Sequence, residues 1–158
     1  MPYTGTQTTV GLQAIAGTET VQSHALGTIT KAKDPLYGEG EFIYLKGLAA
    51  TAVGDAVIYN AYTGVTTRLV AGGKGTLAWA MSANLAGSFG WYQIGGAVVA
   101  NVAAGFTAAA DAYATATAGV IAVAVVAGDL IAGAVGSTAI GTPISTQAVL
   151  TVSRPSIT

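Results

Sequence analysis

Glu39 and Glu41 are the residues of this chain whose type and spacing come nearest to a catalytic pair. On a strand, residues two positions apart point to the same side of the sheet, and two carboxylates held about 5–10 Å apart can hydrolyse a glycosidic bond. The pair also lies at a glycine-rich strand entrance, where charged side chains keep a sheet edge soluble. We predict this second role and keep a small hydrolase that uses both glutamates as the third function class.

His24 is the single histidine, and the chain contains no cysteine. A zinc or copper site needs several such ligands, so we predict no metal, no cofactor and a surface or strand-end position for His24. The aspartates are scattered at turns without the spacing of a calcium loop. We expect them to bond the turn backbone; they are Asp34, Asp55, Asp111 and Asp129.

Two further enzyme motifs are incomplete in this sequence. Residues 72–76 (GGKGT) look like a phosphate loop, but Gly75 stands where that motif has Ser or Thr, and we expect no helix after it. The chain has no Gly-x-Ser-x-Gly elbow, and a serine triad would depend on His24 alone. The sequence therefore predicts a protein that is not an enzyme.

Aromatic side chains on predicted strands and hairpin loops are the remaining candidates for binding. They could form a carbohydrate platform or an interface hot spot; they are Tyr44, Tyr59, Tyr62, Trp79, Trp91 and Tyr92. A chain built mainly from small residues needs its few large ones inside. We therefore predict that Phe42, Trp79 and Trp91 lie in the core, and we leave Tyr62 open.

The charge content is low for a chain of 158 residues. Charged residues make up 8%, against about 25% in ordinary domains, and the net charge is −1. This balance gives no basic field for nucleic acid. With 52% hydrophobic residues and a mean hydropathy of +0.59 the chain is not disordered. A nearly neutral surface favours association, which indicates a subunit of a larger assembly.

Two long uncharged stretches lie between Lys74 and Asp111 and between Asp111 and Asp129. Their length would permit a spanning helix, but glycines and asparagines interrupt the first, and the second has few bulky residues. No cluster of Lys or Arg flanks either stretch, and the first residues show no signal-peptide pattern. We predict no membrane contact.

Glycine and Gly-Asp turns cut the chain about every 6 to 12 residues, which is typical of many short strands in a sandwich or barrel. The strongest strand is 38–47, with apolar residues on both faces, so we expect it to be central or covered. Further strands are expected at 25–33, 56–59, 65–70, 76–81, 90–96, continued at 97–102 after a glycine break, 130–135 and 148–153. Residues 108–112 are alanine-rich and leave room for a short helix.

Residues 1–22 are rich in Thr, Gly and Gln, and we expect them to form an extended N-terminal arm. Their few large apolar residues cannot make a core, so the arm would gain order as a strand on a neighbour's sheet edge; the alternative is a disordered tail. Deleting residues 2–20 would then leave the melting temperature nearly unchanged. The predicted fold is all-β: a single domain over 23–158, as a small β-barrel or jelly-roll-like sandwich, with the arm before it.

Several segments resemble the capsid decoration, or cement, proteins of tailed bacteriophages. They are 26–29 (LGTI), 34–35 (DP), 38–47 (GEGEFIYLKG), 53–55 (VGD), 90–96 (GWYQIGG) and 128–129 (GD). The resemblance covers about residues 25–135. It implies a small β-barrel or jelly-roll-like domain on the outside of the head, contact with the major capsid protein and no catalysis. The low charge of this chain departs from what an outward face requires.

The sequence thus predicts a structural virion protein on the outer surface of the capsid, which stabilises a phage head by bridging major capsid protein subunits. Its expected partners are that protein and further copies of itself, as a dimer or trimer. The alternative is a β-sandwich carbohydrate-binding or adhesion module of a head fibre or tail appendage. The candidate interface residues are Tyr3, Val10, Leu12, Lys31, Lys33 and Tyr62.

Overall fold

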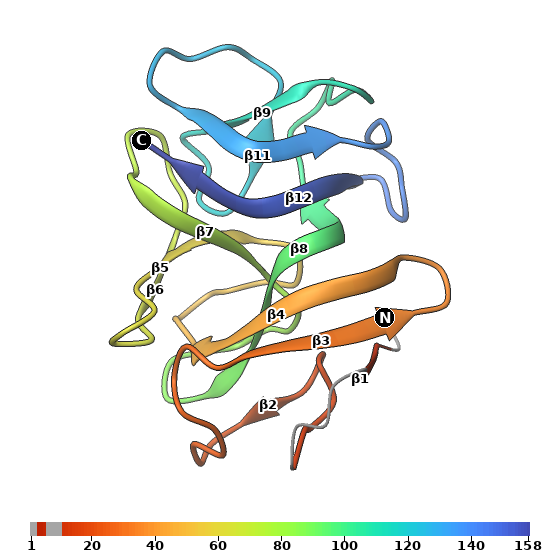
Figure 1. Cartoon of the computed structure of the whole chain (residues 1–158). Helices are drawn as coiled ribbons and strands as arrows, with labels where there is room; N and C mark the ends of the chain where they lie inside the picture. The colour runs from red at the N-terminus through yellow and green to blue at the C-terminus, as the bar shows by residue number, and fades with distance from the viewer. Residues whose placement is uncertain (1–2, 6–10) are drawn as a thin grey trace.

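The protein is all-β, as predicted. The computed structural model describes residues 3–5 and 11–158, and this part of the chain contains strands and turns but no helix. All of its strands belong to one antiparallel sheet, which is not closed into a barrel (Figure 1). The alanine-rich segment 108–112 forms a turn, with Ala109 at a φ of 58°, and then the start of a strand. The described residues include no helix long and apolar enough to cross a membrane.

The strands are numbered in chain order. They are β1 (Thr4–Gly5), β2 (Thr18–Glu19), β3 (Ile29–Asp34), β4 (Gly38–Lys46), β5 (Ala56–Tyr59), β6 (Thr66–Arg68), β7 (Gly75–Ala80), β8 (Phe89–Asn101), β9 (Asp111–Ala114), β10 (Ile121–Ala122), β11 (Leu130–Gly136) and β12 (Gln147–Ile157). Along the sheet their order is β1-β3-β4-β8-β7-β12-β11-β9-β10, with β2 paired to β8, and β5 and β6 extending from β7.

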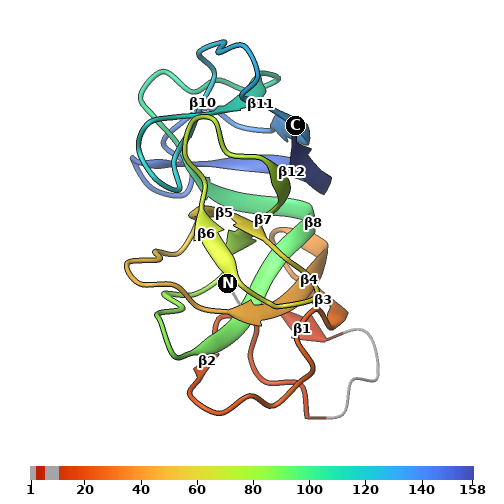
Figure 2. The ribbon, with the colours of Figure 1, turned by 90° about the vertical axis from the view of Figure 1, so that its left-hand side faces the viewer.

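The long strand β8 joins the two ends of the molecule (Figures 1 and 2). Its first half pairs with β4 and β7, and its second half pairs with β12. The predicted glycine break lies where the partners change. Gly96 has a φ of 94°, and a Cβ there would lie 2.4 Å from the carbonyl oxygen of Glu39. Only glycine permits this close approach of β4 and β8.

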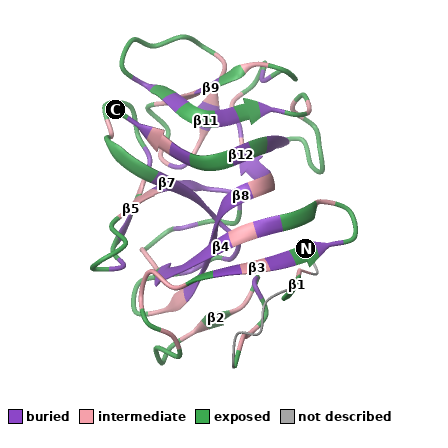
Figure 3. Cartoon of the chain, viewed as in Figure 1, coloured by how far each residue is buried: buried purple, intermediate pink, exposed green. Residues whose placement is uncertain are grey.

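Both faces of β4 are covered, which confirms the prediction for this strand. Phe42 and Tyr44 lie on one face in a cluster with Trp91 and Ile15. On the other face, residues 43 and 45 pack with side chains of β5, β7 and β8. Figure 3 shows the buried middle of β4 crossing the buried first half of β8. Strand β4 therefore separates two small hydrophobic clusters, one on each of its faces.

A third and larger core occupies the other half of the molecule. It contains Leu77 and Trp79 from β7 together with Ala112, Ile121 and Ile131 from β9, β10 and β11. Strands far apart in the sheet order thus contribute to one cluster, so the sheet curls over on itself. The curl buries its inner face without the closure that a barrel requires.

The predicted turn chemistry is confirmed at Asp34 and Asp55. The Asp34 Oδ1 atom accepts backbone N–H groups of the β3–β4 turn. Asp55 and Asp129 follow glycines with φ of 86° and 84° and directly precede strands β5 and β11. The Asp55 carboxylate accepts the Ala52 N–H of its own turn at 2.9 Å. The Asp129 carboxylate instead accepts the N–H of Gly72 at 2.7 Å, in a loop 57 residues away in the chain. Asp111 is the first residue of β9.

The described part of residues 1–22 is docked on the domain's own sheet. Strand β1 pairs with the edge of β3, and β2 pairs with β8. Ile15 is buried, and the Tyr3 ring lies edge-on to Phe42 with 4.8 Å between centroids. This segment therefore covers one face of the β4 region and supplies part of its core.

Candidate interaction surfaces

The structure places the predicted interface residues at three separate positions. Tyr3 and Leu12 pack against the cluster under β4, on the side covered by the N-terminal segment. Lys31 and Lys33 alternate with the buried Ala32 and so lie on the opposite face of β3. Tyr62 is at the tip of the β5–β6 hairpin. The remaining candidate, Val10, lies outside the described residues.

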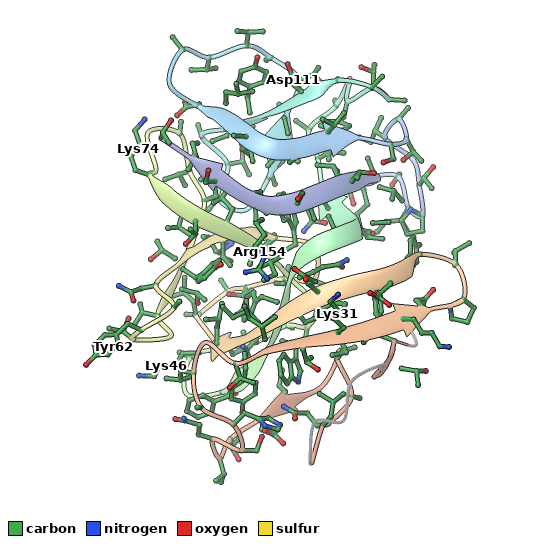
Figure 4. The ribbon with its side chains drawn as sticks, viewed as in Figure 1. Lys31, Lys46, Tyr62, Lys74, Asp111 and Arg154 are labelled. Carbon is green, nitrogen blue, oxygen red and sulfur yellow. The ribbon has the colours of Figure 1, made fainter. Side chains whose placement is uncertain are left out.

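The glutamate pair of β4 lines a charged cleft of about 280 Å³ beside the change of partners in β8. Lys31 Nζ lies 3.6 Å from Glu39 Oε1, and Arg154 Nη2 lies 3.1 Å from Glu41 Oε2. Arg154 Nε also donates to Glu41 Oε2 at 3.2 Å. The two glutamates line the same cleft, as their spacing predicts, and each carboxylate pairs with a cation. Figure 4 labels these two cations, Lys31 and Arg154.

The position of Arg154 depends on an irregular stretch of β12. After Ser153 this strand leaves β8 and pairs with β7 from Ser156 onward. The register with β11 shifts at Gly133, and Arg154 has a φ of 42°. This bulge turns Arg154 toward the cleft. Sequence reasoning missed it because no spacing rule joins a residue to a partner 113 positions away.

His24 packs against aromatic rings instead of standing free on the surface. Its Nε2 atom lies 2.9 Å from Gln13 Oε1, and its ring centroid is 5.2 Å from that of Tyr44. Tyr44 in turn donates to Glu19 Oε2 at 2.9 Å. These bonds tie the N-terminal segment to β4. The described residues hold no group of three His, Cys, Asp or Glu side chains arranged to bind a metal ion.

The aromatic residues divide clearly between core and surface. Phe42, Trp79 and Trp91 are fully buried, which confirms the prediction for all three. Tyr44 and Tyr92 are also buried, and Tyr59 is half-buried. Tyr62 is 94% exposed. A single exposed ring does not make the aligned platform that a carbohydrate module uses.

A groove of about 670 Å³ lies next to Tyr62 on the side formed by β5, β6 and β7. Figure 2 shows these strands facing the viewer. Aliphatic side chains and threonine hydroxyls line the groove, and Lys74 is its one charged lining residue. The sequence predicts neither the groove nor a role of Lys74 in its lining, because the groove forms only where β7 lies beside the β5–β6 hairpin.

The exterior of the described chain is poor in charge and exposes several large apolar side chains. Three ion pairs are present among the described residues, whereas thirteen large apolar side chains are exposed there. The latter are Val21, Ile29, Leu36, Val53, Tyr62, Val65, Val70, Leu85, Val125, Val126, Leu130, Val135 and Ile144. They are spread over most of the molecule instead of forming one patch.

The chain matches no family model, no curated protein and no solved structure.

Proposed function

We propose that this chain is a structural virion protein that decorates the outer surface of a bacteriophage head and stabilises it by bridging major capsid protein subunits. The observation that carries the proposal is the exterior described above, which exposes apolar side chains on many sides. A chain with so few charged residues and a net charge near zero favours association over a free monomeric state. A subunit enclosed by neighbours on a shell buries the same side chains.

The segments that resemble cement proteins support the proposal by their place in the fold. Residues 38–47 include β4, residues 90–96 lie in the first half of β8, and these strands pair at the centre of the sheet. The Gly-Asp pairs at 54–55 and 128–129 directly precede β5 and β11. The resemblance therefore concerns the framework of the fold and assigns no catalytic residue.

The proposed mechanism is the burial of protein surface at many equivalent contacts, whose stabilising contributions add together. A specific contact between two proteins buries roughly 1,600 Å², and a symmetric shell repeats each contact many times. Each bridge adds to the resistance of the shell against internal pressure. The rigid sheet transmits load between the subunits that it joins, because its three cores share β8 and its neighbours.

The test is addition of the purified full-length chain to bare shells made from the major capsid protein of the same genome. We expect it to cosediment with the shells to a fixed ratio and to raise the temperature at which they rupture. Shells of an unrelated phage are the control. Absence of cosedimentation at saturating protein overturns the proposal. Specific binding to a glycan array without shell binding would favour the adhesion module instead.

A further inference from the structure

The loop of the β5–β6 hairpin presents an exposed aromatic side chain, Tyr62, on a hydrogen-bonded backbone. The Asn60 Oδ1 atom accepts the Tyr62 N–H at 2.9 Å and the Thr63 N–H at 3.1 Å. The Asn60 backbone closes the loop through bonds with Gly64 and Val65. These bonds satisfy the loop backbone around Tyr62, so its ring projects from a preorganised support (Figure 4).

The base of the hairpin is also anchored to the body of the protein. Thr66 Oγ1 donates to the Lys46 carbonyl at 2.8 Å, and the Lys46 N–H donates to the Gly64 carbonyl at 2.9 Å. At Gly64 an added Cβ would lie 2.7 Å from the Leu26 side chain. This tight contact with the turn before β3 keeps the hairpin from swinging.

The groove beside the hairpin is shallow and open, and its lining has the chemistry to accept an aromatic ring. Ile58 and Val65 provide aliphatic surface, and Thr67 and Thr76 provide hydroxyl groups at the sides. Lys74 Nζ donates to the Gly128 carbonyl at 3.1 Å and to the Thr158 carbonyl, which holds its charge at the end of the groove. An apolar wall with hydroxyl partners suits a tyrosine, which has an apolar ring and a polar tip.

The projecting ring and the groove lie side by side on the same hairpin. A two-fold contact is self-complementary, because each copy presents the same patch to the other. We propose that two copies of this chain associate through this surface, with Tyr62 of each copy seated in the groove of the other. Among the described residues that line the groove, Lys74 carries the charge, and its ammonium group donates to carbonyl groups of its own chain at the end of the groove, away from the aliphatic wall. Buried tyrosines are frequent hot spots of such contacts.

The association stands independently of the proposed function. If both hold, the hairpin is the surface through which decorating copies meet one another, and the contacts with the shell lie elsewhere on the molecule. A glycan or a capsid segment would be the other possible occupants of the groove. The experiment therefore uses the purified full-length chain alone, without glycan or shell, so that only a second copy is available as occupant.

The first measurement is sedimentation of the full-length chain over a concentration series. We expect a reversible monomer–dimer equilibrium that Tyr62→Ser weakens by at least about tenfold, consistent with the loss of one hot-spot side chain from each copy. Leu36→Ser is the matched control, because Leu36 is 78% exposed on the β3–β4 turn and far from the groove. It should leave the equilibrium unchanged. A monomeric parent chain, or a Tyr62→Ser variant that dimerises like the parent, overturns the proposal.

The second measurement tests the groove separately from the Tyr62 side chain. Thr67→Glu and Thr76→Glu place a charge in the groove at two exposed positions while keeping Tyr62. At a concentration where the parent chain is mostly dimeric, each groove variant alone should be mostly monomeric, as should Tyr62→Ser. A mixture of Tyr62→Ser with either groove variant restores one of the two contacts, so a labelled heterodimer should form at higher concentration. If both mixtures contain no heterodimer while all variants melt like the parent, the reciprocal seating is wrong. Shell binding by a monomeric Tyr62→Ser variant would leave the proposed function standing on its own.

Discussion

Phe42 lies at the centre of the contact between β4 and the N-terminal segment. Its ring is fully buried and is covered by Tyr3. Phe42→Ala should lower the free energy of unfolding by about 3–5 kcal/mol, the usual cost of removing a buried phenylalanine. Urea denaturation measures the loss. Leu36→Ala, at an exposed turn position, should change it by no more than about 0.5 kcal/mol. Equal effects of both substitutions would contradict the core assignment.

Gly96 combines a backbone conformation that side chains avoid with a close approach of two strands. Its φ is 94°, and a Cβ would lie 2.4 Å from the Glu39 carbonyl oxygen. Gly72 has a φ of 79° but open space around it. Gly72→Ala should therefore cost about 1–2 kcal/mol for backbone strain alone. Gly96→Ala should cost clearly more, because β4 and β8 must also separate. Thermal unfolding of both variants checks this, and equal losses would mean that the close approach carries no cost.

At the scale of elements, the sequence predicts what local pattern and turn chemistry determine. The strand expected at 38–47 is β4, and the Gly-Asp turns directly precede β5 and β11. The sequence predicts the glycine break in β8. It does not predict that both halves form one continuous strand, whose first half pairs with β4 and whose second half pairs with β12. The change of β12 from β8 to β7, which directs Arg154 to Glu41, depends on long-range register. No local pattern encodes it.

Strand β1 is fastened by the Tyr3 side chain, and its attachment should weaken at alkaline pH. Burial raises the pKa of Tyr3 from 10.0 to about 12, against a smaller opposing effect of its hydrogen bond with Gln93. The unfolded chain therefore loses this proton at lower pH than the folded chain. The stability that the neutral phenol contributes is complete below about pH 10 and is lost as pH rises through about pH 12.

Tyr3→Phe keeps the ring and removes the ionisable hydroxyl, so it is the matched control. Between about pH 9 and pH 12 the urea midpoint of the parent should fall more steeply than that of Tyr3→Phe. Burial also raises the pKa of Tyr44 and Tyr92. Both of those tyrosines remain in each protein, so the difference between the two curves isolates Tyr3. Parallel curves would show that the Tyr3 phenol does not hold β1 in place.

At the scale of the whole molecule, composition and topology lead to different expectations for the N-terminal segment. Composition predicts a tether, because residues 1–22 hold too few large apolar side chains for a core of their own. The fold leaves one face of β4 and β8 uncovered by any other strand, and the described part of this segment covers it. The sequence does not predict that this face of β4 and β8 lacks a covering strand, because that depends on how all the later strands are arranged in the sheet.

Deletion of residues 2–20 therefore tests which of the two expectations describes the molecule. The deletion removes Ile15, which is 2% exposed, and uncovers Phe42, Tyr44 and Trp91. Loss of such a buried aliphatic side chain costs about 2–5 kcal/mol, so we expect the melting temperature to fall by about 5–15 °C for a chain of this size. Ile15→Ala in the full chain repeats part of this loss where the truncated chain aggregates. An unchanged melting temperature in both proteins would mean that the segment is a tether whose order depends on a neighbour. The same two proteins added to bare shells then show whether the tether is what attaches the subunit.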